Sequence, residues 1–331
     1  MTASQRIDGV LVQWGERLFY PSNRIVRTPP TPRLATMMRR KAAVIRNRIE
    51  ATVRRAPQVM VKVTGGGRGM GAISAHFRYI SKNGRLEIED DRGVVSTGKE
   101  VLNDIADQWR FGGSLIKESG HRREAFNIML SMPAGTDAEF LLKAVREFAR
   151  VELAGHRYVM VLHEHQANPH VHLSVRAESA TGSRLNPRKT DLHRWRETFA
   201  EKLRGWGIDA EASRQATRGA SRNFDPLWRI KAKQEGRLRE TAALLKQGPG
   251  QLNSRAEAAR SWAYITKALA ESNLPNDRKL ARRVAKFLGD TSLVHQLGAD
   301  SLHDLRHNRS LSEDQLLPGL RHRSTGRDVE R

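Results

Sequence analysis

The sequence predicts an α/β fold: a two-layer sandwich with a mostly antiparallel central sheet, plus basic helical extensions at the N- and C-termini. Strand-like and helix-like segments alternate through the middle of the chain, as a sheet covered by helices requires. Two strand-like segments, residues 156–162 and 171–176, are separated only by a short polar turn, so they should pair antiparallel. This pairing argues against a doubly wound parallel sheet.

The expected elements follow one another in a regular order. A proline-rich linker at residues 21–33 precedes a basic helix at 36–55, and the alternating segment 58–63 is the first strand. A glycine-rich loop at 65–71 leads to a helix over 72–82, which Asn83-Gly84 ends. There follow a short hairpin (86–89 and 94–96), a helix (97–109), a strand (124–131), a helix (137–153), the two strands named above, and a helix (192–206). Beyond residue 222 the pattern is helical, with breaks at 248–250 and 273–276.

Charge is unevenly distributed over the 331 residues. The chain has 58 Lys and Arg against 36 Asp and Glu, a formal net charge of +22. Residues 1–57 hold 12 basic and 3 acidic side chains, residues 221–331 hold 21 and 13, and residues 58–220 are closer to balance with 25 and 20. We therefore expect a basic N-terminal extension (1–57), a globular domain (58–220) and a basic, mainly helical C-terminal region (221–331). The flanks could be solvated tails, or they could bind phosphates without reading sequence.

Composition excludes several classes of protein. The absence of cysteine excludes a disulfide scaffold and a cysteine-ligated metal site. No uncharged apolar run approaches the ~18–20 residues that span a bilayer, so we expect no membrane insertion. Charges interrupt the apolar N-terminal stretch, which is therefore not a secretory signal. We expect a cytoplasmic protein whose excess positive charge binds nucleic acid.

Four of the 12 histidines fall within ten residues, in VLHEHQANPHVHLSV. His170 and His172 alternate along a strand and share one face of it. The preceding strand ends at His163, and the turn brings it back alongside. Three neutral imidazoles leave coordination positions open, as a catalytic metal needs. The alternative is a polar strand end whose histidines are bonded to backbone or solvent.

Tyr79 lies on the helix after the glycine-rich loop, away from its apolar stripe of Ile73, Phe77 and Ile80. Cationic neighbours such as Lys82 favour a phenolate and can hold a phosphate. A tyrosine at the edge of the core is the alternative. The loop before this helix, VTGGGRGMG, lacks the Gly-Lys-Ser/Thr ending of a P-loop. It is either a flexible turn or a phosphate contact through its backbone and Arg68.

Three segments in this order resemble conjugative DNA relaxases: HFRYISKNGRLEIE, NIMLSMPAGT and HEHQANPHVHLSV. These are metal-dependent endonucleases named for a histidine-hydrophobic-histidine motif, and the resemblance, over residues 58–220, is to the branch of plasmid mobilisation proteins and the T-DNA border endonuclease. It implies that Tyr79 is the nucleophile and that His163, His170 and His172 bind the metal. Family members commonly carry an acidic residue where this chain has His165, which could be a substitute ligand, a hydrogen-bond donor to a ligand or a proton carrier. Asn168 fits the family's turn.

The resemblance also implies an activity and its partners. A relaxase (nickase) domain would nick and rejoin one DNA strand at a transfer origin through a 5′-phosphotyrosyl intermediate. The family uses magnesium or manganese, whereas three imidazoles alone also suit zinc. The substrate would be single-stranded or locally melted DNA, with accessory nicking proteins, a secretion coupling protein, and export of the protein with the strand as further expectations. Residues expected to contact DNA are Arg68, Arg78, Lys82, Arg85, Ser131, Arg184 and Arg188.

Three other functions are compatible with the sequence. A rolling-circle replication initiator has the same metal and tyrosine design. A non-enzymatic basic nucleic-acid-binding protein would explain the charge but not the clustered histidines. A metal-dependent hydrolase that uses water would leave Tyr79 structural.

Overall fold

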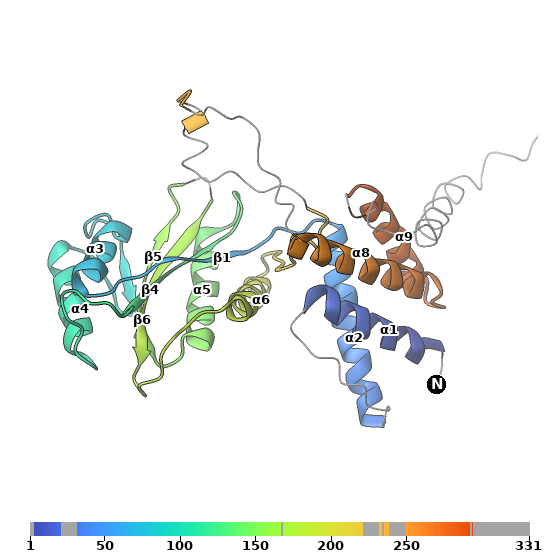
Figure 1. Cartoon of the computed structure of the whole chain (residues 1–331), viewed down its shortest axis with the longest axis horizontal. Helices are drawn as coiled ribbons and strands as arrows, with labels where there is room; N and C mark the ends of the chain where they lie inside the picture. The colour runs from blue at the N-terminus through green and yellow to red at the C-terminus, as the bar shows by residue number, and fades with distance from the viewer. Residues whose placement is uncertain are drawn as a thin grey trace, which may run out of the picture. The chain divides into compact units, whose positions relative to one another are not determined.

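A computed structural model describes residues 3–20, 32–166, 168–220, 232–233, 235–237, 249–291 and 293. The chain divides into two compact units (Figure 1). Residues 56–212 form the unit that we call the central domain. Residues 1–55 and 213–331 form the second, which we call the helical unit.

A six-stranded antiparallel sheet organises the central domain, in the order β1-β4-β6-β5-β2-β3. Its strands are β1 (Met60–Gly65), β2 (Ile88–Asp90), β3 (Val95–Ser96), β4 (Ala125–Ser131), β5 (His156–His163) and β6 (His170–Ser179). As the short turn predicts, β5 and β6 pair antiparallel, with His163 opposite His170. The predicted α/β sandwich with a mostly antiparallel sheet is therefore confirmed.

Helices cover both faces of this sheet. On one face, α5 (Ala138–Glu152) and α6 (Lys189–Gly205) pack on alternate side chains of β4, β5 and β6, with Phe148 and Trp195 at the centre of the core. On the other face, α3 (Met70–Ile80) and α4 (Lys99–Phe111) pack on a smaller core that includes Val159 and Val161 of β5. These two helices add a third layer to the predicted sandwich (Figure 1).

The helical unit joins the two ends of the chain. It contains α1 (Ala3–Phe19), α2 (Pro32–Val53), α8 (Pro249–Ala270) and α9 (Pro275–Gly289). Their apolar faces share one core, in which Trp262 is fully buried against Phe19 and Phe287. The breaks expected at residues 248–250 and 273–276 coincide with the start of α8 and the start of α9. The helical N-terminal extension was expected, but its first helix, α1, was not located from the sequence.

A buried ionic cluster links three of these helices. The guanidinium of Arg46 on α2 donates two hydrogen bonds to Asp277 on α9, at 2.8 and 2.9 Å. It donates a third to Asp8 on α1, at 2.9 Å. Burial by itself would lower the pKa of Arg46, but the hydrogen bonds and charges of the two carboxylates raise it. Helices from opposite ends of the sequence are therefore held by one side chain.

Some expectations lie outside the described residues. They are most of the linker at 21–33, most of the helical pattern expected over residues 222–248, and the part of the C-terminal region beyond residue 293. Among the described residues, no helix has the length and apolar character needed to cross a bilayer.

Candidate active site

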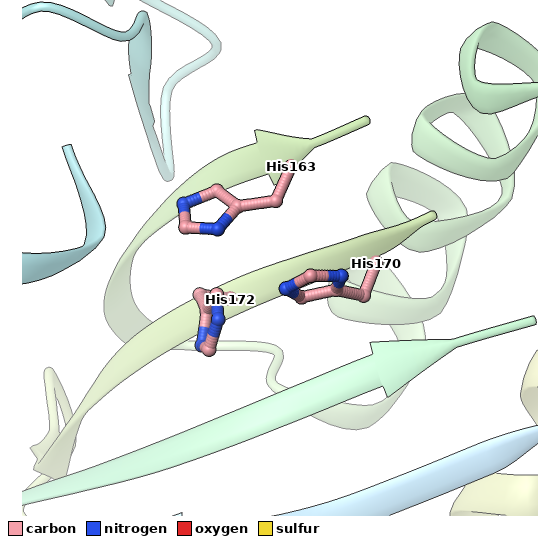
Figure 2. A group of neighbouring side chains, drawn as sticks. All are labelled: His163, His170 and His172. Atoms are coloured by element: carbon pink, nitrogen blue, oxygen red, sulfur yellow. The ribbon is translucent and has the colours of Figure 1, made fainter. Parts of the chain in front are cut away.

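Three imidazoles converge at the paired ends of β5 and β6 (Figure 2). The strand pairing places His163 opposite His170, and His172 follows two residues later on the same face. The ring centroids lie 5.1 Å apart for His163 and His170, 4.8 Å for His163 and His172, and 5.0 Å for His170 and His172. One nitrogen from each ring lies within 4.8 Å of the other two. The predicted convergence of these three side chains is thus observed.

Backbone carbonyls fix the tautomers of two of the rings. Nε2 of His163 lies 2.6 Å from the carbonyl oxygen of Ile80, and Nδ1 of His170 lies 2.9 Å from that of Asn168. A carbonyl can only accept, so each of these nitrogens carries the hydrogen. In the neutral rings, Nδ1 of His163 and Nε2 of His170 then carry the lone pairs that can bind a cation.

The third ring supplies the observation that supports a metal site. Nδ1 of His172 is buried and has no hydrogen-bond partner among the described residues. Burial lowers the pKa of His172 to about 3, and the neighbouring His163, His170 and His76 add to the effect. Burial likewise lowers the pKa of His163. Because protonation is disfavoured, these imidazoles keep the lone pairs that a divalent metal requires. The donor set of three imidazoles fits a divalent transition metal such as zinc, copper or nickel.

Tyr79 lies beside this cluster. Its side chain is 71% exposed, as the helical spacing predicts, while Phe77 and Ile80 on the same helix are buried. The Tyr79 ring lies 6.5 Å from the ring of His172. The hydrogen bond from His163 to the carbonyl of Ile80, the next residue, ties α3 directly to the imidazoles.

His76 is a part of the site that was assigned no role from the sequence, although it precedes Tyr79 by one helical turn. It lies three residues before Tyr79, and its ring is 6.3 Å from that of Tyr79 and 6.5 Å from that of His172. Its Nδ1 contacts the hydroxyl of Ser174 on β6 at 2.6 Å. Burial lowers the pKa of His76 to about 4. The sequence signal for His76 was its position three residues before Tyr79, because residues three apart on a helix are neighbours on its surface.

The glycine-rich loop packs against neighbouring backbone. The N–H groups of Met70 and Gly71, at the start of α3, donate to the carbonyls of Lys117 and Glu118. A Cβ at Gly66 would lie 2.2 Å from the carbonyl oxygen of Ala125. These contacts favour the interpretation of the loop as a close-packed turn over that of a phosphate-binding nest.

The residues expected to contact DNA are in different environments. Those with exposed side chains are Arg68, Arg78, Lys82, Arg85 and Arg188. Arg184 forms ion pairs with Glu124 and Glu178. Ser131 is buried, and its hydroxyl donates to the carbonyl of Pro169.

Two further residues of the histidine-bearing turn were expected near the metal. His165 is exposed, with its ring 5.2 Å from that of His163, and it is not part of the three-histidine group. Asn168 is exposed, and it contributes its backbone carbonyl to orient His170.

Strand register extends the site across the sheet. His172 on β6 pairs with Met129 on β4, and Met129 pairs with Lys62 on the edge strand β1. Paired residues point to the same face, so the exposed Lys62 side chain faces the side of the sheet that carries the imidazoles. Two strand spacings of ~4.8 Å place it roughly 10 Å from His172 along this row. Sequence alone did not indicate Lys62, because the order of strands was unknown.

Part of the central domain is similar to a known protein family. Residues 79–208 match the family model of the MobA/VirD2-like relaxase nuclease domain. The chain is also 26% identical over 184 residues to the T-DNA border endonuclease VirD2 of Rhizobium radiobacter, an alignment that covers 49% of this chain and 43% of that protein. The matched segment contains Tyr79 and all three clustered histidines. The two matches support a nuclease domain of the MobA/VirD2-like relaxase branch within the central domain.

Proposed function

We propose that this protein nicks one DNA strand at a transfer origin and rejoins it, with Tyr79 as the nucleophile. The observation that carries the proposal is the exposed Tyr79 ring 6.5 Å from His172, beside a cluster of three imidazoles. The match of residues 79–208 to the relaxase nuclease domain supports DNA nicking as the reaction. The initiation of conjugative transfer or mobilisation is the process that such a nick serves.

The chemistry is a transesterification. The phenolic oxygen of Tyr79 attacks the scissile phosphorus, the bond from phosphorus to the 3′-oxygen breaks, and the leaving strand ends in a 3′-hydroxyl. The phenolic proton is lost, and the leaving oxygen gains one, so the reaction consumes no water. One ester replaces another, so a returning 3′-hydroxyl can reverse the step and reseal the strand.

His163, His170 and His172 would hold the divalent ion. When bound, such an ion neutralises charge that develops on the scissile phosphate. The family favours magnesium or manganese, and the all-imidazole donor set also suits zinc. His76 lies beside both Tyr79 and His172, where its ring would limit the position of the Tyr79 ring.

Basic side chains around Tyr79 would hold the substrate strand. Arg78 and Lys82 are exposed next to the nucleophile on α3, and Lys62 lies across the sheet from His172. Exposed cations of this kind suit the phosphates of a single or locally melted strand. Accessory nicking proteins and a secretion coupling protein are the partners we expect from the family.

A covalent adduct provides the decisive test. The full chain would be incubated with manganese and single-stranded oligonucleotides that tile the DNA next to its gene, and denaturing gels would detect protein–DNA bands. Mass spectrometry should locate the nucleotide on the peptide that contains Tyr79. The Tyr79→Phe variant should lose the adduct and retain binding, whereas Tyr264→Phe, which changes another exposed tyrosine in the helical unit, should behave as wild type.

Each alternative function has a distinct outcome in this assay. Repeated nicking without a covalent band would identify a hydrolase that uses water. Binding with neither nicking nor adduct would identify a non-enzymatic nucleic-acid-binding protein. The target of the nick, a transfer origin or a replication origin, would separate a relaxase from a rolling-circle initiator. Normal nicking by His170→Ala would overturn the metal assignment.

A further inference from the structure

The last two described helices form a pair joined by a short turn. Four residues, 271–274, connect α8 to α9 (Figure 1). Both helices bury an apolar face in the same core, to which α9 contributes Leu280, Val284 and Leu288. A helix pair with a turn of this length is the arrangement that places a recognition helix on DNA in helix-turn-helix proteins.

The other face of α9 is uniformly basic. Arg278, Lys279, Arg283 and Lys286 are exposed, and Arg282 is half-buried between them. Arg283 forms an ion pair with Glu50 of α2. Arg278, Lys279 and Lys286 form no ion pair with any residue that the structure describes. At 1.5 Å per residue, the positive side chains extend over roughly 12 Å of helix.

The single acidic side chain of α9 points inward. Asp277 is buried, and it accepts two hydrogen bonds from Arg46 and one from the hydroxyl of Ser272 in the turn, at 2.8 Å. These bonds fix the first turn of α9 to α2 and to the connection from α8. The basic face is therefore mounted on a rigid support, which reduces the entropy lost on binding.

We propose that α9 binds duplex DNA by lying in its major groove. The groove is ~12 Å wide and admits an α-helix, and its walls are rows of phosphates that complement the five cations of α9. Residues near the start of a recognition helix contact base edges, and here these are Asn276, Arg278 and Lys279, all exposed. Arginine and asparagine are side chains that can read guanine and adenine there.

The chemistry of this face favours a duplex over other polyanions. Single-strand-binding surfaces stack bases on aromatic side chains, and α9 exposes none, because its one aromatic residue, Phe287, is buried. The major groove of duplex RNA is deep and narrow and does not admit a helix. This surface is separate from the nicking chemistry, and its test does not require Tyr79 or a metal.

Fluorescence anisotropy of the full chain would test the proposal, with EDTA present to prevent nicking. The probes are a 30-base-pair DNA duplex, one of its single strands, and an RNA duplex of the same sequence. The variant Arg278→Gln/Lys279→Gln/Lys286→Gln removes three exposed charges from α9. The control Arg6→Gln/Arg39→Gln/Arg40→Gln removes three exposed charges from α1 and α2.

The α9 variant should bind the DNA duplex at least about tenfold more weakly at low salt, and the loss of three cations from the groove should reduce the salt-dependence slope by at most about 2.7. Binding to the single strand should change less than threefold, and the control should remain close to wild type. An unchanged thermal melt would show that α9 is still folded, and Lys279→Glu alone should weaken duplex binding in the same direction. The proposal would be wrong if the α9 variant bound the DNA duplex as tightly as the wild type. It would also be wrong if the control variant, or binding to the single strand, lost as much affinity, or if the wild type bound the RNA duplex more tightly than the DNA duplex.

Discussion

Replacing Arg46 by methionine should strongly destabilise the helical unit. The arginine side chain is 22% exposed, while the carboxylates of Asp8 and Asp277 are 8% and 4% exposed. Methionine fills much of the same volume but removes the three hydrogen bonds that these carboxylates accept. Asp277 would keep the hydroxyl of Ser272 as its partner among the described residues. Two buried carboxylates would then lack their cation.

The magnitude follows from the cost of an unpaired buried charge. Breaking a buried ion pair by removing one partner costs about 3–5 kcal/mol. Since the guanidinium keeps some contact with solvent, we expect a loss near the lower end, about 3 kcal/mol. For a unit of this size, that corresponds to a fall in melting temperature on the order of 10 °C.

Scanning calorimetry of the full chain would measure the effect, because the two units should give separable transitions. Lys41→Met is the matched control: it removes one charge from α2, but Lys41 is 56% exposed and pairs with Glu16 at 3.0 Å near the surface. Surface pairs contribute about 0–1 kcal/mol. If Arg46→Met melted no lower than Lys41→Met, the claim that this cluster holds α1, α2 and α9 together would be wrong.

Three further predictions concern the central domain. Lys62→Gln should weaken binding of a single-stranded oligonucleotide and reduce the salt-dependence slope by about 0.7. The control Lys143→Gln, on α5 at the opposite face of the sheet, should do neither. If filter-binding titrations gave equal slopes for the two variants, Lys62 would not contact the DNA. Burial lowers the pKa of His172 to about 3 and that of His76 to about 4. Between these values and the unfolded pKa near 6.5, the unfolded chain therefore binds more protons than the folded chain. Stability to urea without metal should therefore be full above pH 6.5 and fall with pH below it, and His76→Gln should flatten this dependence; an unchanged pH profile in that variant would contradict the assignment. Gly66→Ala should destabilise the domain by about 1–3 kcal/mol, because its Cβ would meet the carbonyl of Ala125 at 2.2 Å, whereas Gly9→Ala, with open space around it, should be neutral or stabilising in thermal melts.

Much of the central domain could be predicted from local patterns. The pairing of β5 and β6 followed from a turn too short for a parallel crossover, and it brought His163 to His170 without any long-range information. The exposure of Tyr79 followed from its angle to the stripe of Phe77 and Ile80 on α3. These features depend on sequence separations of a few residues, where backbone geometry decides direction.

The rest of the site depends on contacts between distant segments. His76 could not be assigned, because its partner Ser174 is 98 residues away. The relevance of Lys62 depends on β1 pairing with β4, and β4 with β6, an order that no local pattern encodes. The carbonyl that fixes the tautomer of His163 was equally hidden, since it belongs to Ile80 on the helix of Tyr79, 83 residues away.

The sequence by itself determined the antiparallel α/β class, the histidine-bearing ribbon, the exposed tyrosine and the excess of positive charge, because each is a property of neighbouring residues. Only the tertiary structure decided that the two basic flanks fold together and that Arg46 joins their helices. It also decided that Tyr79 lies beside the imidazoles and that α9 exposes four cations while burying Asp277. The physical reason is that burial and charge pairing act between surfaces, and the partner of a surface is set by the whole fold.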